Sequence, residues 1–341
     1  MPEPDETLPA APAAAGAEPR RFAPEELLTC DSCLRANAPT RTQCLYCGAG
    51  LGAISSRSRS ELPFAGTGPE ANRIYIVART GPGQAIAHSV LEQLAERLQF
   101  KPAELQAGFA SCGPLPLTNA SREEAAELLS ELQAGGFDAF SIPVSEVETS
   151  LAARKIRALE FTATSLSALT TSPVQQLGAA WSDLLLIVSG RLQINRVEVD
   201  ERQSRNSIKY LDRRELSHDE SVIDLYVKSD AAWRIGATDF DFSCLGEQIG
   251  LTAFENLRAL IELLLRRSGA ELNDAYTRIR PLLNVMWPLE TTSSKSRSRR
   301  PRASPKDVSV VTATDNTVQF DNYSRLAWGV KLAGVENPKV G

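Results

Sequence analysis

The stretch SREEAAELLSELQAGGFDAFSIP (residues 121–143) carries the clearest structural signals in this chain of 341 residues. Ser121 and Glu124 have the spacing of a capping box, in which a hydroxyl and a carboxylate each bind a free backbone N–H at the start of a helix. Apolar side chains then recur on one helical face. Gly135 follows as a stop signal, because glycine closes a helix at low conformational cost. The stretch therefore predicts a helix followed by a strand at 137–144.

The sequence before this stretch predicts further elements of one small α/β unit. RIYIVAR (73–79) is rich in strand-forming residues. Apolar positions from Ile86 to Leu98 fall on one helical face, and Pro102 suits the first position of a second helix. With an extended segment at 112–117, the predicted order across residues 73–144 is β-α-α-β-α-β.

This order resembles the C-terminal domain of the bacterial ribosomal stalk protein, a fold shared with the adaptor of the Clp protease. The resemblance rests on the strand at 74–78, the helix expected from about Gln84, and the run 121–143. It implies a module that binds other proteins. The lysine-rich binding face of the stalk domain has no counterpart here, since Arg122 is the one basic residue within 121–134.

Four cysteines near the N-terminus predict a metal site within residues 27–52. They form two CxxC pairs separated by ten residues, namely Cys30, Cys33, Cys44 and Cys47. Two such pairs give a closed tetrahedral set of thiolates, which is typical of one structural Zn²⁺ and leaves no open position for a reacting water. Metal binding would supply the folding free energy of so short a segment. An iron site or a redox dithiol pair is the less favoured alternative.

The segment resembles two families of small zinc modules. CLYCGAGL (44–51) is similar to bacterial zinc ribbons, and C-x2-C-x3-N-x6-C-x2-C is the spacing of Ran-binding nucleoporin-type zinc fingers, with Asn37 at the asparagine position. Some members of the second family bind single-stranded RNA by stacking a base on a tryptophan. Leu28 stands in that position, and stacking supplies much of such binding. Protein contact is therefore favoured over RNA, with Asn37 and Tyr46 as candidate contact residues.

Residues 156–288 predict a second, α+β domain. Gly190-Arg191 suits a tight turn between two strands, and 200–221 reads as a long charged loop. Thr252 and Glu255 form a second capping box, opening a helix with Phe254 and Leu257 on its apolar face. The strands are expected at 158–163, 184–189, 192–199, 222–227 and 232–235, and a last helix begins at Glu271 and is limited by Pro281. Antiparallel strands closed by one long helix are compatible with a pleckstrin-homology-like barrel.

The remaining segments read as flexible connections in an α+β multidomain chain. Residues 1–26 are predicted to be disordered, 53–72 a linker, 145–155 a hinge, and 289–341 a basic flexible linker and tail. FDNYSRLAW (320–328) in that tail is a candidate docking motif that folds on a partner. The candidate contacts to nucleic acid or anionic lipid in the linker are Arg297, Arg299, Arg300 and Arg302, with a solvated tether as the alternative.

Other reactive side chains give weak signals. The two histidines, His88 and His218, read as surface residues, and their scarcity limits acid–base catalysis. Gly81-Pro-Gly83 is interpreted as a turn. The isolated Cys112 and Cys244 read as buried thiols. The acidic residues of a predicted solvated loop are Asp239, Asp241 and Glu247.

Composition narrows the classes of function. The net charge is −5, so no field of the whole chain attracts nucleic acid or anionic lipid. The longest strongly apolar run, Leu184 to Val188, is far shorter than the roughly 20 residues of a membrane span. The sequence predicts a cytoplasmic, non-enzymatic, zinc-binding adaptor or regulatory protein with an unknown protein partner. An RNA-associated protein and an enzyme with its site in 156–288 are the alternatives.

Overall fold

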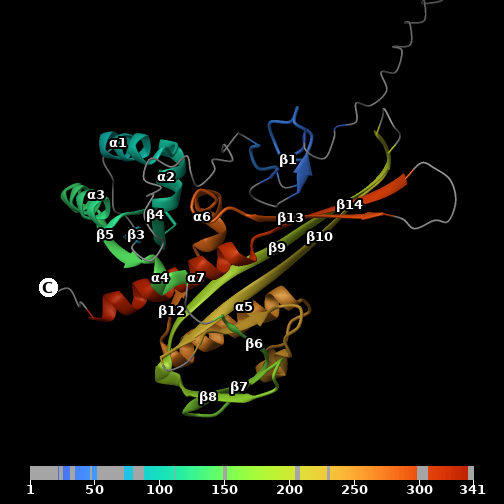
Figure 1. Ribbon diagram of the computed structural model, residues 1–341. Coiled ribbons are helices and arrows are strands. Elements are labelled where there is room, and N and C mark those ends of the chain that lie inside the picture. The colour runs from blue at the N-terminus through green and yellow to red at the C-terminus, as the bar shows by residue number, and fades with distance from the viewer. Residues whose placement is uncertain are drawn as a thin grey trace, which may run out of the picture.

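The protein is of mixed α+β class (Figure 1). The computed structural model describes residues 22, 26–30, 35–46, 48–51, 73–79, 88–111, 113–148, 152–203, 208–228, 231–297 and 306–336. Its strands form a two-stranded, a three-stranded and a nine-stranded sheet. The two-stranded sheet pairs β1 (Leu28–Thr29) with β2 (Ala36–Asn37).

The three-stranded antiparallel sheet has the order β4-β3-β5 and is accompanied by helices. Along the chain its elements follow as β-α-α-β-α-β, and Ser121 and Glu124 make the expected capping box at the start of α3. The bounds are β3 (Ile74–Arg79), α1 (His88–Leu98), α2 (Pro102–Phe109), β4 (Pro114–Ala120), α3 (Arg122–Ala134), β5 (Asp138–Pro143) and the short α4 (Val144–Glu148).

The nine-stranded sheet has the order β13-β14-β9-β10-β11-β6-β7-β8, and β12 also pairs with β9. Its strands are β6 (Arg154–Phe161), β7 (Ser165–Thr170), β8 (Gln176–Ala180), β9 (Leu184–Gln203), β10 (Ile208–Val227), β11 (Trp233–Gly236), β12 (Glu271–Asn273), β13 (Glu290–Arg297) and β14 (Lys306–Asp315). The helices of this part are η4 (Trp181–Asp183), η5 (Phe242–Gln248), α5 (Ala253–Ser268), α6 (Tyr276–Leu283) and α7 (Thr317–Glu336).

Strands β9 and β10 form one long hairpin, so the predicted turn at Gly190-Arg191 and the predicted charged loop at 200–221 are both wrong. Gly190 lies inside β9 instead. A Cβ at this position would fall 2.6 Å from Phe320 Cδ2. Glycine at residue 190 therefore leaves room for the Phe320 ring of α7 and does not mark a turn. The distal part of the hairpin extends away from the helices as an arm (Figure 1).

The C-terminal segment is not the flexible tail that the sequence suggested. Strands β13 and β14 pair with each other, and β14 pairs with β9. The expected docking motif at 320–328 lies in α7, where Phe320, Tyr323 and Leu326 are fully buried. These side chains recur at helical spacing and fill this chain's own core, which leaves them unavailable to a partner.

One hydrophobic core joins the three-stranded sheet and its helices to β9, β10, α6 and α7. Trp287 Nε1 donates a hydrogen bond to Tyr75 Oη at 2.9 Å, and the two ring centroids are 5.4 Å apart. Residues on both sides of the expected hinge at 145–155 therefore share one core. A second core lies between the strands β6 to β11 and the helices η5 and α5.

Buried polar contacts attach α7 to the large sheet. Arg234 binds both carboxylate oxygens of Asp224 at 2.7 Å and reaches Asp321 Oδ1 at 2.6 Å. Ser324 Oγ donates to Asp224 Oδ2 at 2.7 Å and lies 3.0 Å from Tyr226 Oη. Burial, together with the negative charge of Asp224, raises the pKa of Tyr226, so its hydroxyl stays protonated.

Asn316 occupies the edge of β9 between the part that pairs with β12 and the part that pairs with β14. Its Oδ1 accepts the backbone N–H of Gln193 at 2.7 Å, and its Nδ2 donates to the carbonyl of Arg191 at 2.9 Å. The fully buried amide thus takes the place of a neighbouring strand at these two groups.

Candidate functional site

In the region of the predicted zinc site the backbone makes a tight turn around Cys44, which we call the Cys44 knuckle. The N–H of Cys44 donates a hydrogen bond to the carbonyl of Ala49 at 2.7 Å, and the N–H of Gly48 donates one to the carbonyl of Cys44 at 3.0 Å. Gly48 has a φ of 73°, in the left-handed region that favours glycine. The thiols of Cys30 and Cys44 are both buried. The other two predicted ligands, Cys33 and Cys47, lie outside the described residues.

The sulfur of Cys44 receives two N–H groups. Asn37 Nδ2 and the backbone N–H of Tyr46 each lie 3.4 Å from Cys44 Sγ. Asn37 also donates to the carbonyl of Arg35 and accepts the N–H of Leu45, each at 2.9 Å. Hydrogen bonds of this kind favour the thiolate, the form that binds metal. Asn37 is buried, so it can position the knuckle but cannot be the exposed contact residue that the sequence suggested.

Four cysteine thiolates would be a suitable donor set for Zn²⁺. The part of the chain that the structure describes contains no cluster of three or more histidine, cysteine or acidic side chains able to hold a metal. Two of the four cysteines fall outside that part. The fit therefore rests on the two described thiols and on the N–H donors around Cys44.

The tip of the knuckle is exposed and next to the arm of the long hairpin. Leu45 and Tyr46 are 61% and 45% exposed. The guanidinium of Arg35 lies 4.7 Å from the ring centroid of Tyr46, and partial burial, followed by the charge of Glu215, raises the pKa of Tyr46. On the arm, Glu215 Oε1 accepts the backbone N–H of Ala36 at 3.3 Å.

Of the predicted basic contact residues, Arg297 is the one that the structure describes, and it lies at the distal end of the arm. Arg297 is the last residue of β13 and pairs with Val308. Arg202 of β9 stands across from Lys209 of β10, and Lys306 of β14 pairs with Gln203 of β9. The distal ends of two hairpins therefore lie side by side and bring basic positions together. Arg299, Arg300 and Arg302 lie outside the described residues.

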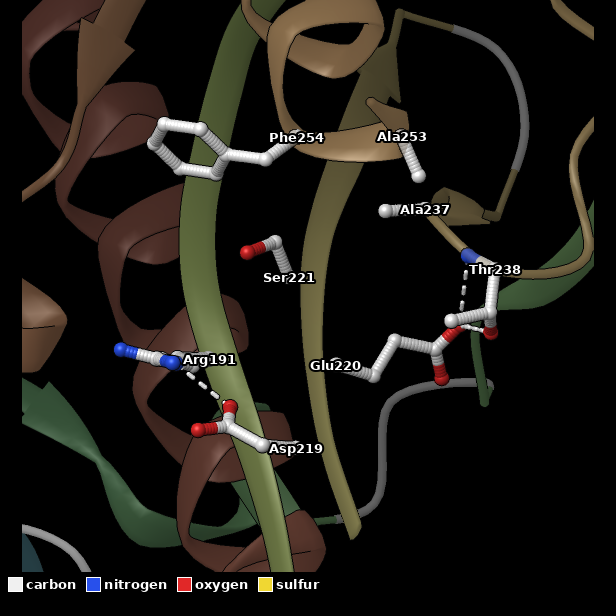
Figure 2. A pocket seen from close by; sticks show the side chains of 8 residues that line it. All are labelled: Arg191, Asp219, Glu220, Ser221, Ala237, Thr238, Ala253 and Phe254. Carbon is white, nitrogen blue, oxygen red and sulfur yellow. Dashed lines mark hydrogen bonds and ion pairs between the residues drawn. The ribbon is translucent and has the colours of Figure 1, made fainter. Parts of the chain in front are cut away.

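A pocket of about 460 Å³ lies between the long hairpin and the start of α5 (Figure 2). We call it the α5 pocket. Arg191 forms an ion pair with Asp219, whose other oxygen accepts from Gln193 Nε2 at 3.3 Å. Glu220 Oε1 accepts the Thr238 backbone N–H at 3.2 Å and its hydroxyl. The lining residues are Arg191, Asp219, Glu220, Ser221, Ala237, Thr238, Ala253 and Phe254.

Large apolar side chains remain exposed where α5 begins. Ile249, Leu251 and Phe254 are 51%, 101% and 64% exposed. Phe254, expected on the apolar face of its helix, is exposed instead, because Leu257, Leu260 and Leu264 form the buried face. Phe254 lies in the first turn, before the buried stripe begins. The sequence did contain a signal for this surface, since three bulky apolar residues fall within six positions at the capping box of α5.

The other reactive side chains that the structure describes lie on several different elements, and His218 is close enough to Asp239 for its charge to act on that carboxylate. His88 is exposed on α1 beside Glu92, and His218 lies in β10. Asp239 pairs with Lys155 at 2.6 Å, which lowers its pKa. Asp241 caps η5 by accepting the N–H of Ser243.

The isolated cysteines differ in what the structure shows of them. Cys244 is partly buried, and desolvation raises its pKa to about 11, so its thiol is protonated at neutral pH. Cys112 lies outside the described residues, as does Gly81-Pro-Gly83.

Comparison with known proteins identifies no relative. The chain matches no known protein family, no curated protein and no solved structure. Within the described residues, no helix is both long and apolar enough to cross a membrane.

Proposed function

We propose that this protein is a non-enzymatic, zinc-binding adaptor that acts through protein–protein contacts. The observation that carries the proposal is the knuckle around Cys44. Its buried sulfur faces two N–H donors, while Leu45 and Tyr46 at its tip are exposed to solvent. A closed thiolate site of this kind stabilises a small fold and leaves its exterior for binding.

Two features of the fold support an adaptor role. The β-α-α-β-α-β order of residues 74–143 is similar to that of the ribosomal stalk and Clp adaptor module, a protein-binding fold. The contact between Glu215 and the backbone of Ala36 would hold the zinc ribbon against the arm. The pleckstrin-homology-like interpretation of the larger part has as its support the antiparallel strands that pack against α5, and it stays a prediction.

Metal analysis of the full chain tests the zinc proposal. We expect native mass spectrometry to find one Zn²⁺ per chain in the wild type and in the matched control Cys244→Ser, whose thiol lies in another core. Cys30→Ser and Cys44→Ser should lose the metal. Asn37→Ala should keep the metal but release it faster to a chelator, because one N–H donor to Cys44 is removed. Wild-type protein without stoichiometric zinc would refute the proposal.

Affinity purification with and without RNase tests the mode of action. Leu45→Ser with Tyr46→Ser should lose protein partners that survive RNase, whereas Val174→Ser, at a side chain 66% exposed, should retain them. Equal recovery with both variants would argue against contact through the knuckle.

The RNA-associated alternative has one observation in its favour, the basic positions at the distal end of the arm. Binding of this kind weakens steeply with salt, because it releases counterions. If it is correct, partners should disappear after RNase treatment. A chain with Arg202 and Lys209 replaced by glutamine should then bind a single-stranded RNA probe more weakly and with a shallower salt dependence.

A further inference from the structure

We propose that the α5 pocket and its apolar rim bind a segment of a partner protein that carries a basic side chain flanked by apolar residues. This inference deepens the proposed adaptor function, on which it rests, by assigning a second contact surface and the chemistry of its partner. The rim consists of Ile249, Leu251 and Phe254, and the pocket is the one shown in Figure 2.

The rim has the composition of an interface centre. A large apolar side chain left in water forfeits the free energy that its burial would release. Single exposed apolar residues are ordinary, but clustered ones mark binding surfaces. Leu251 makes almost no contact with its own chain, and Phe254 belongs both to the rim and to the pocket lining. A partner that covers this cluster would remove both side chains from water together.

The charges of the pocket select a cation. Its charged lining residues are Arg191, Asp219 and Glu220, which carry a net charge of one negative. The start of α5 adds a positive partial charge of about 0.5. The carboxylate of Glu255 opposes it, because it binds the backbone N–H of Thr252 at the same helix end. The balance remains negative, so a guanidinium or ammonium group is favoured over an anion.

Both carboxylates are held in place before any partner arrives. Thr238 fixes Glu220 through two hydrogen bonds to Oε1. Glycine at residue 236 leaves space for the Glu220 carboxylate, since a Cβ there would lie 2.9 Å from Glu220 Cδ and would overlap Oε1. Arg191 and Gln193 hold Asp219 in the same way. Preorganised groups bind with less loss of conformational entropy than mobile ones.

The shape of the site favours a protein segment over a small molecule. A volume of about 460 Å³ falls within the range of about 300–1,000 Å³ of ligand pockets. Ile249 and Leu251 are outside the lining, however, and a small molecule in the pocket would leave them in water. A peptide whose basic side chain enters the pocket can place neighbouring apolar residues on this rim.

Selection from a phage-displayed library of random 12-residue peptides tests the inference with the full chain as bait. The expected result is enrichment of sequences with arginine or lysine beside leucine, isoleucine or phenylalanine. Binding of a selected synthetic peptide should weaken at least tenfold in Phe254→Ser and Leu251→Ser, and several-fold in Glu220→Gln. Val174→Ser, the exposed apolar control, should bind like the wild type. Because the three apolar positions are exposed, these variants are expected to fold.

Three results would overturn the inference. They are no enrichment, enrichment of acidic or uncharged peptides, and selected peptides that bind Phe254→Ser as tightly as the wild type. The experiment also separates this inference from the proposed function. If peptides fail here while Leu45→Ser with Tyr46→Ser still loses partners, the second surface alone is wrong. If neither surface affects any partner, the adaptor function itself is refuted.

Discussion

Replacing Gly190 with alanine should destabilise the protein, because β9 and α7 touch at this position. The added Cβ would lie 2.6 Å from Phe320 Cδ2 and 3.1 Å from Cζ, and nearer still to Cε2. Normal separation of carbon atoms is about 3.5–4.0 Å, so the ring must retreat by about 1 Å. Phe320 is fully buried and has no free space to enter.

The size of the effect follows from two opposing terms. Overpacking of a filled core costs about 1–3 kcal/mol. Alanine in a strand regains about 0.5–1 kcal/mol over glycine, because the unfolded chain has fewer conformations. We therefore expect a net loss of about 1–2 kcal/mol in the free energy of unfolding. The assay is urea unfolding followed by tryptophan fluorescence and by circular dichroism.

Two matched variants make the test specific. Gly178 lies in β8, where a Cβ would meet nothing within 4 Å, so Gly178→Ala should be neutral or slightly stabilising. Combining Gly190→Ala with Phe320→Leu should cost less than the sum of the single changes, because the smaller side chain makes room. If Gly190→Ala were as stable as Gly178→Ala, residue 190 would not be packed under α7, and the corrected course of β9 would be refuted.

Three further predictions concern buried polar groups. Asp224→Ala should cost about 3 kcal/mol in unfolding free energy, the lower end for a broken buried ion pair, because the Arg234 guanidinium loses its bidentate partner but keeps Asp321; Ser324→Ala, which removes one hydrogen bond to the same carboxylate, should cost about 1 kcal/mol and serves as the comparison. Asn316→Ala should cost about 1–3 kcal/mol, since it leaves the buried N–H of Gln193 without its partner, and hydrogen exchange should show faster exchange of the Gln193 amide; unchanged exchange would contradict the edge contact. Cys244 should react slowly with iodoacetamide at pH 7 and faster as the pH approaches its pKa of about 11, and rapid labelling at neutral pH would count against its burial. Between about pH 9 and 11 the free energy of unfolding should fall as the pH rises, because the unfolded chain loses the thiol proton first.

Local signals in the sequence identified the elements whose ends are fixed by neighbouring residues. The capping boxes at Ser121 and Thr252 open α3 and α5, and Gly269 closes α5 in the left-handed conformation. A cap is a contact over three residues, so its spacing can be read without tertiary structure. The strand at 74–79 was equally visible, because its side chains are almost all buried and form one short apolar run.

Elements that depend on distant partners could not be predicted in this way. The distal part of the hairpin is rich in charged side chains, so it lacks the alternation that reveals a half-buried strand, and it read as a loop. Gly190 was interpreted as part of a turn, because no neighbouring residue in the sequence indicates that Phe320 packs against it. The aromatic patch at 320–328 was recognised and interpreted as a docking motif, but binding to a partner and packing in the chain's own core give the same pattern.

The candidate sites also differ in whether local sequence could predict them. The cysteine spacing predicts a metal site from the sequence alone, whereas the α5 pocket combines Arg191 and Asp219 of the hairpin with Phe254 of α5. These residues are brought together by the sheet and have no shared motif. Asn37 shows the converse, because its position in a motif was visible while its burial behind Cys44 was not.

The position of α7 in the core sets the order of events during synthesis. Residues 74–143 leave the ribosome long before residues 317–336, and at about 5–20 residues per second the interval is on the order of ten seconds or more. Until then Tyr75, Leu186 and Val188 lack the helix that completes their shared core. Nascent chains of this protein should therefore keep part of this core uncovered until α7 has been made, and ribosome-bound fragments that end before residue 317 should be cut by protease at sites that the finished chain protects.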